Sequence, residues 1–319
     1  MSGYRIMPTR DEDPDAWREV LGATDVVAVL GLSPYRSPLS VWLEKRGEEQ
    51  PEPSAAMKRG LLLESVVATY YEHETGRTLA AVAPYALGVL AASPDRYTIG
   101  NDGRLVEIKT HSTWVRSQYG EAGTGDVPPH IAAQLMAQVA LARRTRHIAA
   151  AQSPVHDVAA FFGDEFATFT LQYDAELGED LLTRAEAWWE RHIVGEVPPE
   201  VGAQDSDWIA RTFSEPRTDE IVQADAATED LIAELRQATL DTKAATARKD
   251  ALSNRLKVAI GEAAILRSSC GQFTYRLVSG GEIVDDKALR ERHPDVYAEV
   301  AKARASSRRL SSPRGFADE

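Results

Sequence analysis

The segment SPDRYTIGNDGRLVEIKTHS, residues 93–112, constrains this chain more than any other stretch. Its alternating residues and its GNDG turn predict two short antiparallel strands, with Asp95 near the first strand and Glu107 and Lys109 in the second. Alternate side chains of a strand share a face, so Glu107 and Lys109 should point the same way while Ile108 points into the core. Carboxylates and an amine gathered in this way seldom help folding, which favours a chemical role for them.

Adjacent strands can bring the carboxylates of Asp95 and Glu107 beside the backbone carbonyl of Ile108. Hard oxygen donors of this kind suit Mg²⁺, or Mn²⁺ in its place. A bound metal would polarise a phosphate oxygen and activate a water, and Lys109 would orient the nucleophile or stabilise transition-state charge. The pattern alone is also compatible with an ordinary solvated strand edge.

Two amphipathic helices are expected on either side of this unit. The apolar spacing over 54–76, with Gly76 at its end, predicts a helix that carries Glu64 among apolar neighbours. The stretch 128–145 begins with proline and predicts a second core helix that carries Gln134. The chain order is thus a helix with Glu, a strand with Asp, a strand with Glu-x-Lys and a helix with Gln.

Composition limits the function classes. The 319 residues carry a formal charge of -13, which argues against a protein that coats nucleic acid nonspecifically. The single cysteine, Cys270, excludes an internal disulfide framework and a cysteine-rich zinc site. No signal-peptide pattern or apolar run of membrane-spanning length occurs, so we expect a cytoplasmic protein without membrane contact.

Other elements can be predicted from local signals. Thr24 is expected to cap a helix that ends at a Gly-Leu-Ser-Pro break, and a second helix should start near Pro38. Further helices are expected over 174–195 and about 225–264, the second with only a thin apolar stripe. Strands are expected at 78–85, 88–93, 104–110, 147–154 and 166–173, with a hairpin over 271–286 that turns at Gly280 and Gly281.

The character of the chain changes near residue 205. We therefore expect one domain over 1–205 and a mainly helical extension over 206–319, with a β-hairpin and a basic, serine-rich tail. The extension is interpreted as a packing or oligomerisation arm, or alternatively as a surface that binds DNA or a partner protein. Arg308 and Arg309 are its candidate phosphate contacts.

The motifs in this order resemble the lambda-exonuclease-like, YqaJ-type viral recombinase nucleases of the PD-(D/E)xK superfamily. The resemblance implies an α/β fold, in which a restriction-endonuclease-like mixed sheet is flanked by helices. It covers roughly residues 12–200. The stretches that carry it are GATDVVAVLGLSPYRSPLSVWLEKRG, RGLLLESVVATYYEHETG, SPDR, VEIKT and HIAAQLMAQVAL.

The resemblance also implies roles for single residues. Asp95 and Glu107 would be metal-binding carboxylates, assisted by the Ile108 carbonyl, and the site would hold two Mg²⁺ ions. Lys109 would be the catalytic lysine. Glu64 would help to hold metal, and Gln134 would be the glutamine near the site.

A DNA path is implied on the N-terminal side of the site. The family's T-A-S-D-like turn corresponds to GATD here, so Thr24 would supply a hydroxyl to a phosphate. Ser33, Tyr35 and Arg36 are candidate DNA contacts in the GLSPYR loop, and Arg18 is the candidate for the family's arginine. The departures of GATD and of Arg96 in SPDR from the family pattern bear on the phosphate pocket more than on metal chemistry.

The implied activity is exonuclease action on linear duplex DNA, from 5′ to 3′, leaving 3′ overhangs for recombination with a single-strand annealing protein. A phage or prophage origin and a homo-oligomeric ring, a trimer or tetramer, come with it. One alternative is a structure- or sequence-specific endonuclease of the same superfamily. Another is a noncatalytic module that binds DNA ends or the annealing protein.

Overall fold

The computed structural model describes residues 3–49, 54–100, 103–216, 220–281, 284–302, 308–313 and 316. The chain divides into two compact units, Met1–Ile209 and Ala210–Glu319. We call them the N-terminal unit and the C-terminal unit. Residues 101 and 102 of the expected GNDG turn lie outside the described residues.

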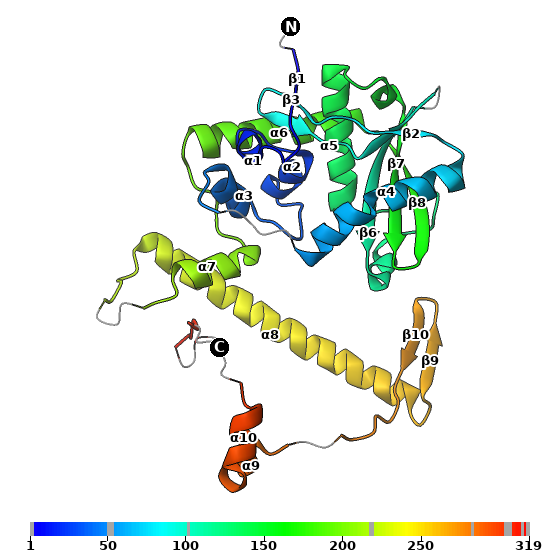
Figure 1. The fold of residues 1–319 in the computed structure, drawn as a ribbon. Helices are drawn as coiled ribbons and strands as arrows, with labels where there is room; N and C mark the ends of the chain where they lie inside the picture. Colours follow the sequence, from blue (N-terminus) through cyan, green and yellow to red (C-terminus); the bar gives the residue numbers. More distant parts are fainter. Residues whose placement is uncertain are drawn as a thin grey trace. The chain divides into compact units, whose positions relative to one another are not determined.

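A five-stranded mixed sheet forms the centre of the N-terminal unit (Figure 1), in the order β2-β5-β6-β7-β8. Its β6 and β7 pair in parallel and its other neighbours are antiparallel. A smaller sheet has the order β1-β3-β4. The strands are β1 Arg5–Ile6, β2 Leu79–Ala80, β3 Tyr85–Leu87, β4 Leu90–Ala92, β5 Arg96–Thr98, β6 Leu105–His111, β7 Val155–Phe162 and β8 Glu165–Gln172.

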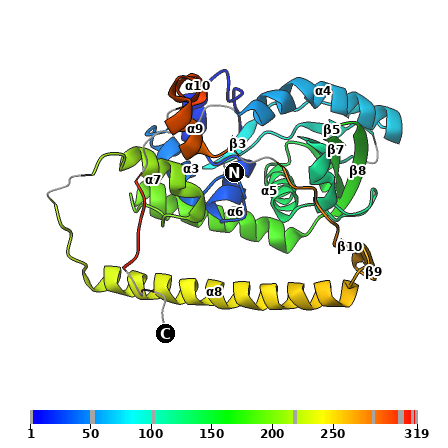
Figure 2. The same ribbon diagram turned by 90° about the horizontal axis from the view of Figure 1, so that it is seen from below.

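Helices cover both faces of the main sheet. Figure 2 shows α4 on one face and α5 and α6 on the other. The helices of this unit are α1 Pro14–Arg18, α2 Ala23–Val29, α3 Pro38–Lys45, α4 Ala55–Thr75, α5 Pro129–Thr145 and α6 Ala175–Trp189, and α7 Ser206–Thr212 spans the boundary between the units. The expected fold class, a mixed sheet flanked by helices, is confirmed.

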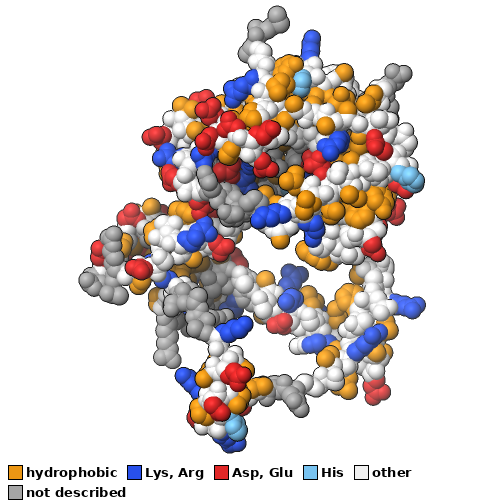
Figure 3. All heavy atoms as spheres, in the orientation of Figure 1, with side chains coloured by type: hydrophobic (Ala, Val, Ile, Leu, Met, Phe, Trp, Pro, Cys, Tyr) orange, Lys and Arg blue, Asp and Glu red, His pale blue; other side chains and the backbone are white. Residues whose placement is uncertain are grey.

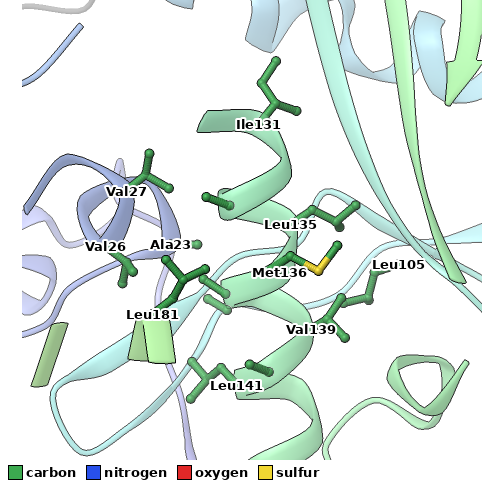
Figure 4. Close-up of a cluster of buried hydrophobic side chains, with 14 of the residues drawn as sticks. Ala23, Val26, Val27, Leu105, Ile131, Leu135, Met136, Val139, Leu141 and Leu181 are labelled. Atoms are coloured by element: carbon green, nitrogen blue, oxygen red, sulfur yellow. The ribbon is translucent and has the colours of Figure 1, made fainter. Parts of the chain in front are cut away.

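The largest core surrounds α5, as Figure 4 shows. Leu135 and Met136 of α5 are buried beside Val26 of α2, Leu105 of β6 and Leu181 of α6. A second cluster lies on the other face of the sheet, where Val67, Ala68 and Tyr71 of α4 pack on Val106 and Ile108 of β6. These two layers hold β6 between α4 and α5, and β6 carries the Glu-Ile-Lys motif.

Capping residues fix the ends of the helices around the sheet. Ser54 accepts a hydrogen bond from the Met57 N–H at the start of α4, and Gly76 ends the helix in the left-handed region at φ 69°. Ser37 caps α3, and Pro129 begins α5. These helix boundaries agree with those expected from the sequence.

Some local predictions are wrong. The N-cap of α2 is Gly22, and Thr24 lies inside the helix, because the side chain of Asp25 accepts the Gly22 N–H that begins the turn. Residues Ala149–Gln152 form a short 3-10 helix and not a strand. The strand β7 was not predicted, because its sequence VHDVAAFF is buried on both faces and lacks alternation.

The C-terminal unit contains one long helix, α8 Ala226–Ile260, and short elements after it. These are β9 Ile265–Ser268, β10 Gly271–Thr274, α9 Asp286–Arg292 and α10 Pro294–Val300. The hairpin β9–β10 therefore lies earlier than expected, and its strands are joined at Ser269 and Cys270. The long helix was predicted correctly. None of the described helices is long and apolar enough to cross a membrane.

Candidate active site

The pairing of β5 with β6 positions the two predicted carboxylates. Arg96 lies opposite Val106 in this antiparallel pair, so Asp95, just before β5, lies beside Glu107. The Asp95 Oδ2 accepts a hydrogen bond of 2.7 Å from the Ile108 N–H. The N–H and C=O of one strand residue point to the same side, so the Ile108 carbonyl also faces Asp95. The Ile108 side chain is buried against α4, as predicted.

Glu107 is held by α5 and by its own strand. The carboxylate is almost fully buried, and its Oε1 accepts a hydrogen bond of 2.6 Å from Gln134 Nε2. The Lys109 Nζ lies 2.5 Å from the same oxygen and 3.1 Å from Gln134 Oε1. Glu107, Lys109 and Gln134 therefore form one connected group, as expected of side chains that share a face of β6 and look toward α5.

Gln138 belongs to the same group, although the motifs did not indicate it. It lies one turn after Gln134 on α5, and its Nε2 donates a hydrogen bond of 2.9 Å to Glu107 Oε2. Its own Oε1 is buried without a hydrogen-bond partner in the described part of the chain. The spacing of four positions after Gln134 was the available signal, because residues at that spacing share a helix face.

Burial and charge shift the proton equilibria of this group. Burial, together with the neighbouring carboxylate of Glu107, raises the pKa of Asp95 well above its usual range. Burial alone would lower the pKa of Lys109, but Glu107 and Asp95 outweigh that effect and raise it. Lys109 is therefore a cation that contacts Glu107 and is attracted by Asp95.

Glu64 reaches this group from α4 through an arginine. Its Oε1 lies 2.5 Å from Arg96 Nη1, which also donates to the Asp95 carbonyl oxygen. Its charge contributes to the raised pKa of Asp95, so Glu64 is electrically coupled to the carboxylate pair. The helix glutamate thus lies at the edge of the group, where Arg96 neutralises it.

A divalent cation such as Mg²⁺ needs several oxygen ligands around one point. Within the described residues, no group of three or more His, Cys, Asp or Glu side chains is arranged to hold a metal ion. The Asp95 carboxylate lies at the β5 side of β6 beside the Ile108 backbone, and the Glu107 carboxylate of the same strand faces α5. Burial and, after it, the Glu107 charge raise the pKa of Asp95, and a divalent cation would offset the second of these effects. Carboxylate and carbonyl oxygens are donor types that suit Mg²⁺ or Mn²⁺.

Residues 15–145 match the family profile of the YqaJ-like viral recombinase domain. The resemblance predicted from the motifs is therefore confirmed for this stretch of the chain. The matched stretch includes α4, β5, β6 and α5, and so every member of the carboxylate group.

Individual proteins are similar over longer stretches. The uncharacterized protein YqaJ of Bacillus subtilis (strain 168) is 23% identical over 307 residues, which cover 92% of this chain and 91% of that protein. A crystal structure of LHK-Exo in complex with dAMP has 20% identity and a TM-score of 0.46, and it covers 58% of this chain and 93% of its own. The structure of an alkaline exonuclease (LHK-Exo) from Laribacter hongkongensis has 19% identity and a TM-score of 0.44, over 56% and 91% of the two chains.

The candidate DNA contacts predicted from the sequence differ in their exposure and in their partners. Tyr35 is 74% exposed, and Thr24 is exposed on the first turn of α2. Ser33 accepts hydrogen bonds from the N–H groups of Tyr35 and Arg36, which shapes the loop. The Arg18 guanidinium lies against Asp15.

Arg36 belongs to a charged network centred on Asp25. Its guanidinium contacts Asp25 at 2.6 Å and Glu44 at 2.5 Å. Lys45, which is fully buried, contacts Asp25 at 2.7 Å, and Arg10 contacts it at 3.2 Å. Arg36 thus forms ion pairs within the protein. A contact with DNA, as predicted, would have to form in addition to these ion pairs.

An aromatic and histidine cluster borders the carboxylate group and was not predicted as part of the site. His111 follows Lys109 on the same face of β6, and its Nε2 lies 2.7 Å from the Tyr119 hydroxyl. His130 lies one turn before Gln134 on α5, with its ring 5.7 Å from that of Tyr35. Burial and the Lys109 charge lower the pKa of His111 to about 4, so it is neutral near pH 7.

Proposed function

We propose that this chain is a Mg²⁺-dependent deoxyribonuclease that hydrolyses phosphodiester bonds of duplex DNA. The observation that carries the proposal is the convergence of Asp95, Glu107 and Lys109 with Gln134 at one edge of β6. Paired carboxylates beside an ammonium group suit phosphodiester hydrolysis, because that reaction needs both a metal and a stabilised anionic transition state.

The metal ligands would be the carboxylates of Asp95 and Glu107 and the Ile108 carbonyl, with Glu64 assisting through water. Two Mg²⁺ ions per site are proposed, with Mn²⁺ as a substitute. When bound, the metal supplies Lewis-acid polarisation of the phosphate and a lowered pKa for a water molecule.

The protein's own side chains would orient the reacting groups and neutralise the charge that develops on them. Lys109 carries a positive charge beside the carboxylates and would orient the attacking water or stabilise the charge that develops on the phosphate. Gln134 donates to Glu107 and accepts from Lys109, so it would fix both side chains in one geometry.

Within this nuclease activity, the proposed mode of cleavage is exonucleolytic. We propose that one strand of a linear duplex is degraded from 5′ to 3′, leaving a 3′ overhang for a single-strand annealing protein in phage-type recombination. The description of the matching family as a viral recombinase domain supports this role. The exposed Tyr35 and Thr24 would contact the DNA, with Ser33, Arg36 and Arg18 nearby on the same path.

A homo-oligomeric ring, a trimer or a tetramer, would reconcile DNA binding with the charge of the chain. The formal charge of -13 repels DNA from most of the surface. A ring can turn basic groups toward a central channel and acidic groups outward, so that DNA is held only in the channel.

Digestion of DNA in the presence of Mg²⁺ tests the proposal. The substrates are linear duplexes with a 5′ phosphate or a 5′ hydroxyl and a covalently closed circle. We expect rapid loss of one strand of the 5′-phosphorylated linear duplex, no cleavage of the circle and no activity with a chelator present. Lys109→Ala should lower the rate by about 10²-fold or more, whereas Lys243→Ala in α8 serves as the matched control.

The alternatives give different results. Nicking of closed circles would indicate an endonuclease. Binding of ends without cleavage would indicate a noncatalytic module, and cleavage that survives both Asp95→Ala and Lys109→Ala would contradict the site assignment.

A further inference from the structure

The long helix α8 exposes a row of large apolar side chains. None of its residues is buried, and its leucines Leu231, Leu235, Leu252 and Leu256 are 64%, 44%, 47% and 40% exposed. Helices in proteins gain most of their stability from packing of an apolar face. Figure 1 shows α8 as one unbroken helix, so the row runs along a single continuous surface.

The row has the spacing of a coiled coil. From Leu231 to Ala259, an apolar or small residue recurs at alternating steps of four and three positions, and Lys249 is the exception. This seven-residue period keeps one seam of a helix facing a partner helix. We call this row the α8 seam. Pairs of leucines lie near its two ends, and its middle holds small residues and Lys249.

Charges beside the α8 seam are distributed unequally along the helix. The residues that directly precede every second seam position are Glu234, Asp241, Arg248 and Arg255. The N-terminal pair is acidic and the C-terminal pair is basic. On the other side of the seam, the residues Ile232, Thr239, Thr246, Ser253 and Ile260 carry no charge.

We infer that α8 pairs in antiparallel orientation with α8 of a second copy of this chain. In that orientation Glu234 lies beside the partner's Arg255, and Asp241 lies beside the partner's Arg248. The two-fold symmetry of the pair repeats both contacts, which gives four attractive pairs. The acidic end of one α8 matches the basic end of another α8 in this orientation. We therefore infer that the partner is a second copy of this chain and not a different protein.

The seam residues match in the same register. Leu231 packs against the partner's Leu256, and Leu235 packs against the partner's Leu252, so leucine meets leucine at both ends. In the middle, Thr242 meets the partner's Ala245, and these small side chains let the helices approach closely. Lys249 meets the partner's Ala238, which leaves space for the lysine stem to extend to water.

A parallel pair fits less well. It would place Lys249 against the partner's Lys249 at the centre of the seam, where two like charges repel. It would also place the charged Glu234 and Arg248 beside uncharged residues of the partner, so the attractive pairs would be lost. The seam residues and the flanking charged residues therefore favour the same register and the same antiparallel orientation of the two helices.

This interface differs in symmetry from the contacts of a ring. An antiparallel helix pair is isologous, whereas a closed ring of three subunits uses head-to-tail contacts. The inference depends on α8 alone and holds whether or not the chain cleaves DNA.

Disulfide formation in the full-length chain tests the orientation. In a Cys270→Ser background, one protein carries Leu235→Cys and another carries Leu252→Cys. We expect the mixture to form a disulfide-linked dimer under mild oxidation, and each protein alone to remain monomeric on a nonreducing gel. Self-linkage of each protein alone would show a parallel pair, and no linkage in a concentrated mixture would overturn the inference.

Charge reversal tests the pairing by a second route. Glu234→Arg with Asp241→Arg turns four attractive pairs into repulsive ones, and should raise the dimer dissociation constant by roughly tenfold or more. Adding Arg248→Glu and Arg255→Glu to the same chain should restore the original constant.

The control for charge reversal is Asp230→Arg with Asp250→Arg, which changes net charge equally but lies away from the seam. Sedimentation velocity over a concentration series measures the constants, and circular dichroism verifies the helix content. Equal weakening by the control, or failure of the four-fold variant to recover, would overturn the inference.

Discussion

The two units of this chain bury their side chains to very different extents. The N-terminal unit encloses an apolar cluster on each face of its main sheet, a third cluster beside its smaller sheet, and several buried charged residues. Among the described residues of the C-terminal unit, none is buried. Figure 3 shows that apolar side chains also gather on the surface over α4. The two units still differ, because nearly every apolar side chain of the C-terminal unit is exposed, whereas the N-terminal unit buries most of its own.

This difference indicates two sources of structural stability. The N-terminal unit is specified by its own packing, so its candidate active site rests on a strand packed between α4 and α5. The C-terminal unit has a long helix that is defined by its local preferences and charge pattern, and the apolar α8 seam would be covered by a second copy in the proposed pair. Substitutions of the same type should therefore have large effects in one unit and small effects in the other.

The largest effect is expected at the buried charge network. Asp25→Ala leaves the fully buried Lys45 without its carboxylate, and should lower the free energy of unfolding by about 3–5 kcal/mol. The matched change Asp250→Ala on the exposed surface of α8 should change it by less than about 0.5 kcal/mol. Urea unfolding at pH 7 measures both. Similar losses in the two variants would contradict the contrast between the units.

Leucine truncation compares the packing of the two units directly. Leu135 on α5 is fully buried, and Leu135→Ala should cost about 2–5 kcal/mol, because it removes apolar contacts and leaves a cavity. Leu277 is 100% exposed, and Leu277→Ala should cost less than about 0.5 kcal/mol. Thermal unfolding followed by circular dichroism distinguishes the two. A marked loss for Leu277→Ala would indicate that something covers this residue in solution.

A buried histidine should make the stability of the N-terminal unit depend on pH. Burial, with Arg143 nearby, lowers the pKa of His156 to about 4. Its Nδ1 accepts the Leu105 N–H at 3.1 Å, so protonation would place two donors against each other. The unfolded chain binds a proton first as pH falls below about 6.5, and up to about 3 kcal/mol should be lost between there and pH 4.

The variant His156→Asn retains an acceptor for Leu105 but cannot gain a proton. We expect it to flatten the fall in unfolding free energy between pH 6.5 and 4, measured by urea unfolding at several pH values. His73→Asn, on the exposed part of α4, is the control and should keep the original slope. Equal slopes in the two variants would show that other groups cause the pH dependence.

The predictions from the sequence were most accurate for elements that have both a clear capping or turn signal and one buried apolar face. The helix α4 has a serine cap, a terminal glycine and an apolar period, and it was predicted almost to the residue. Asp95, Glu107 and Lys109 could be grouped because a strand pair and its alternation limit where their side chains lie. The contact of Asp95 with the Ile108 N–H could not be anticipated, because it depends on the register of β5 against β6.

The failures have physical causes as well. A fully buried strand such as β7 has no polar alternation, so its pattern does not distinguish it from a helix segment. The ion pairs of Arg36 could not be anticipated from its loop, because its two carboxylate partners lie eight and eleven positions away in the chain. Gln138 was missed because a glutamine inside an apolar helix gives no sign of its partner on another element.

The smallest expected effect concerns the positioning of Glu107. Gln138→Met keeps the side-chain volume but removes the 2.9 Å hydrogen bond to Glu107 Oε2, which leaves a buried carboxylate oxygen without that donor. The cleavage rate should fall about 10- to 100-fold at limiting Mg²⁺, as is usual for groups that orient a metal ligand.

The readout for Gln138→Met is the Mg²⁺ dependence of nucleotide release from linear duplex DNA. A positioning role predicts a higher half-saturating Mg²⁺ concentration and partial recovery of the rate at high Mg²⁺, because the misplaced carboxylate still binds metal when the ion is abundant. Gln237→Met, on the exposed surface of α8, should leave both quantities unchanged. If Gln138→Met lowers only the unfolding midpoint and leaves the Mg²⁺ curve in place, Gln138 packs the core beneath the site but does not orient Glu107.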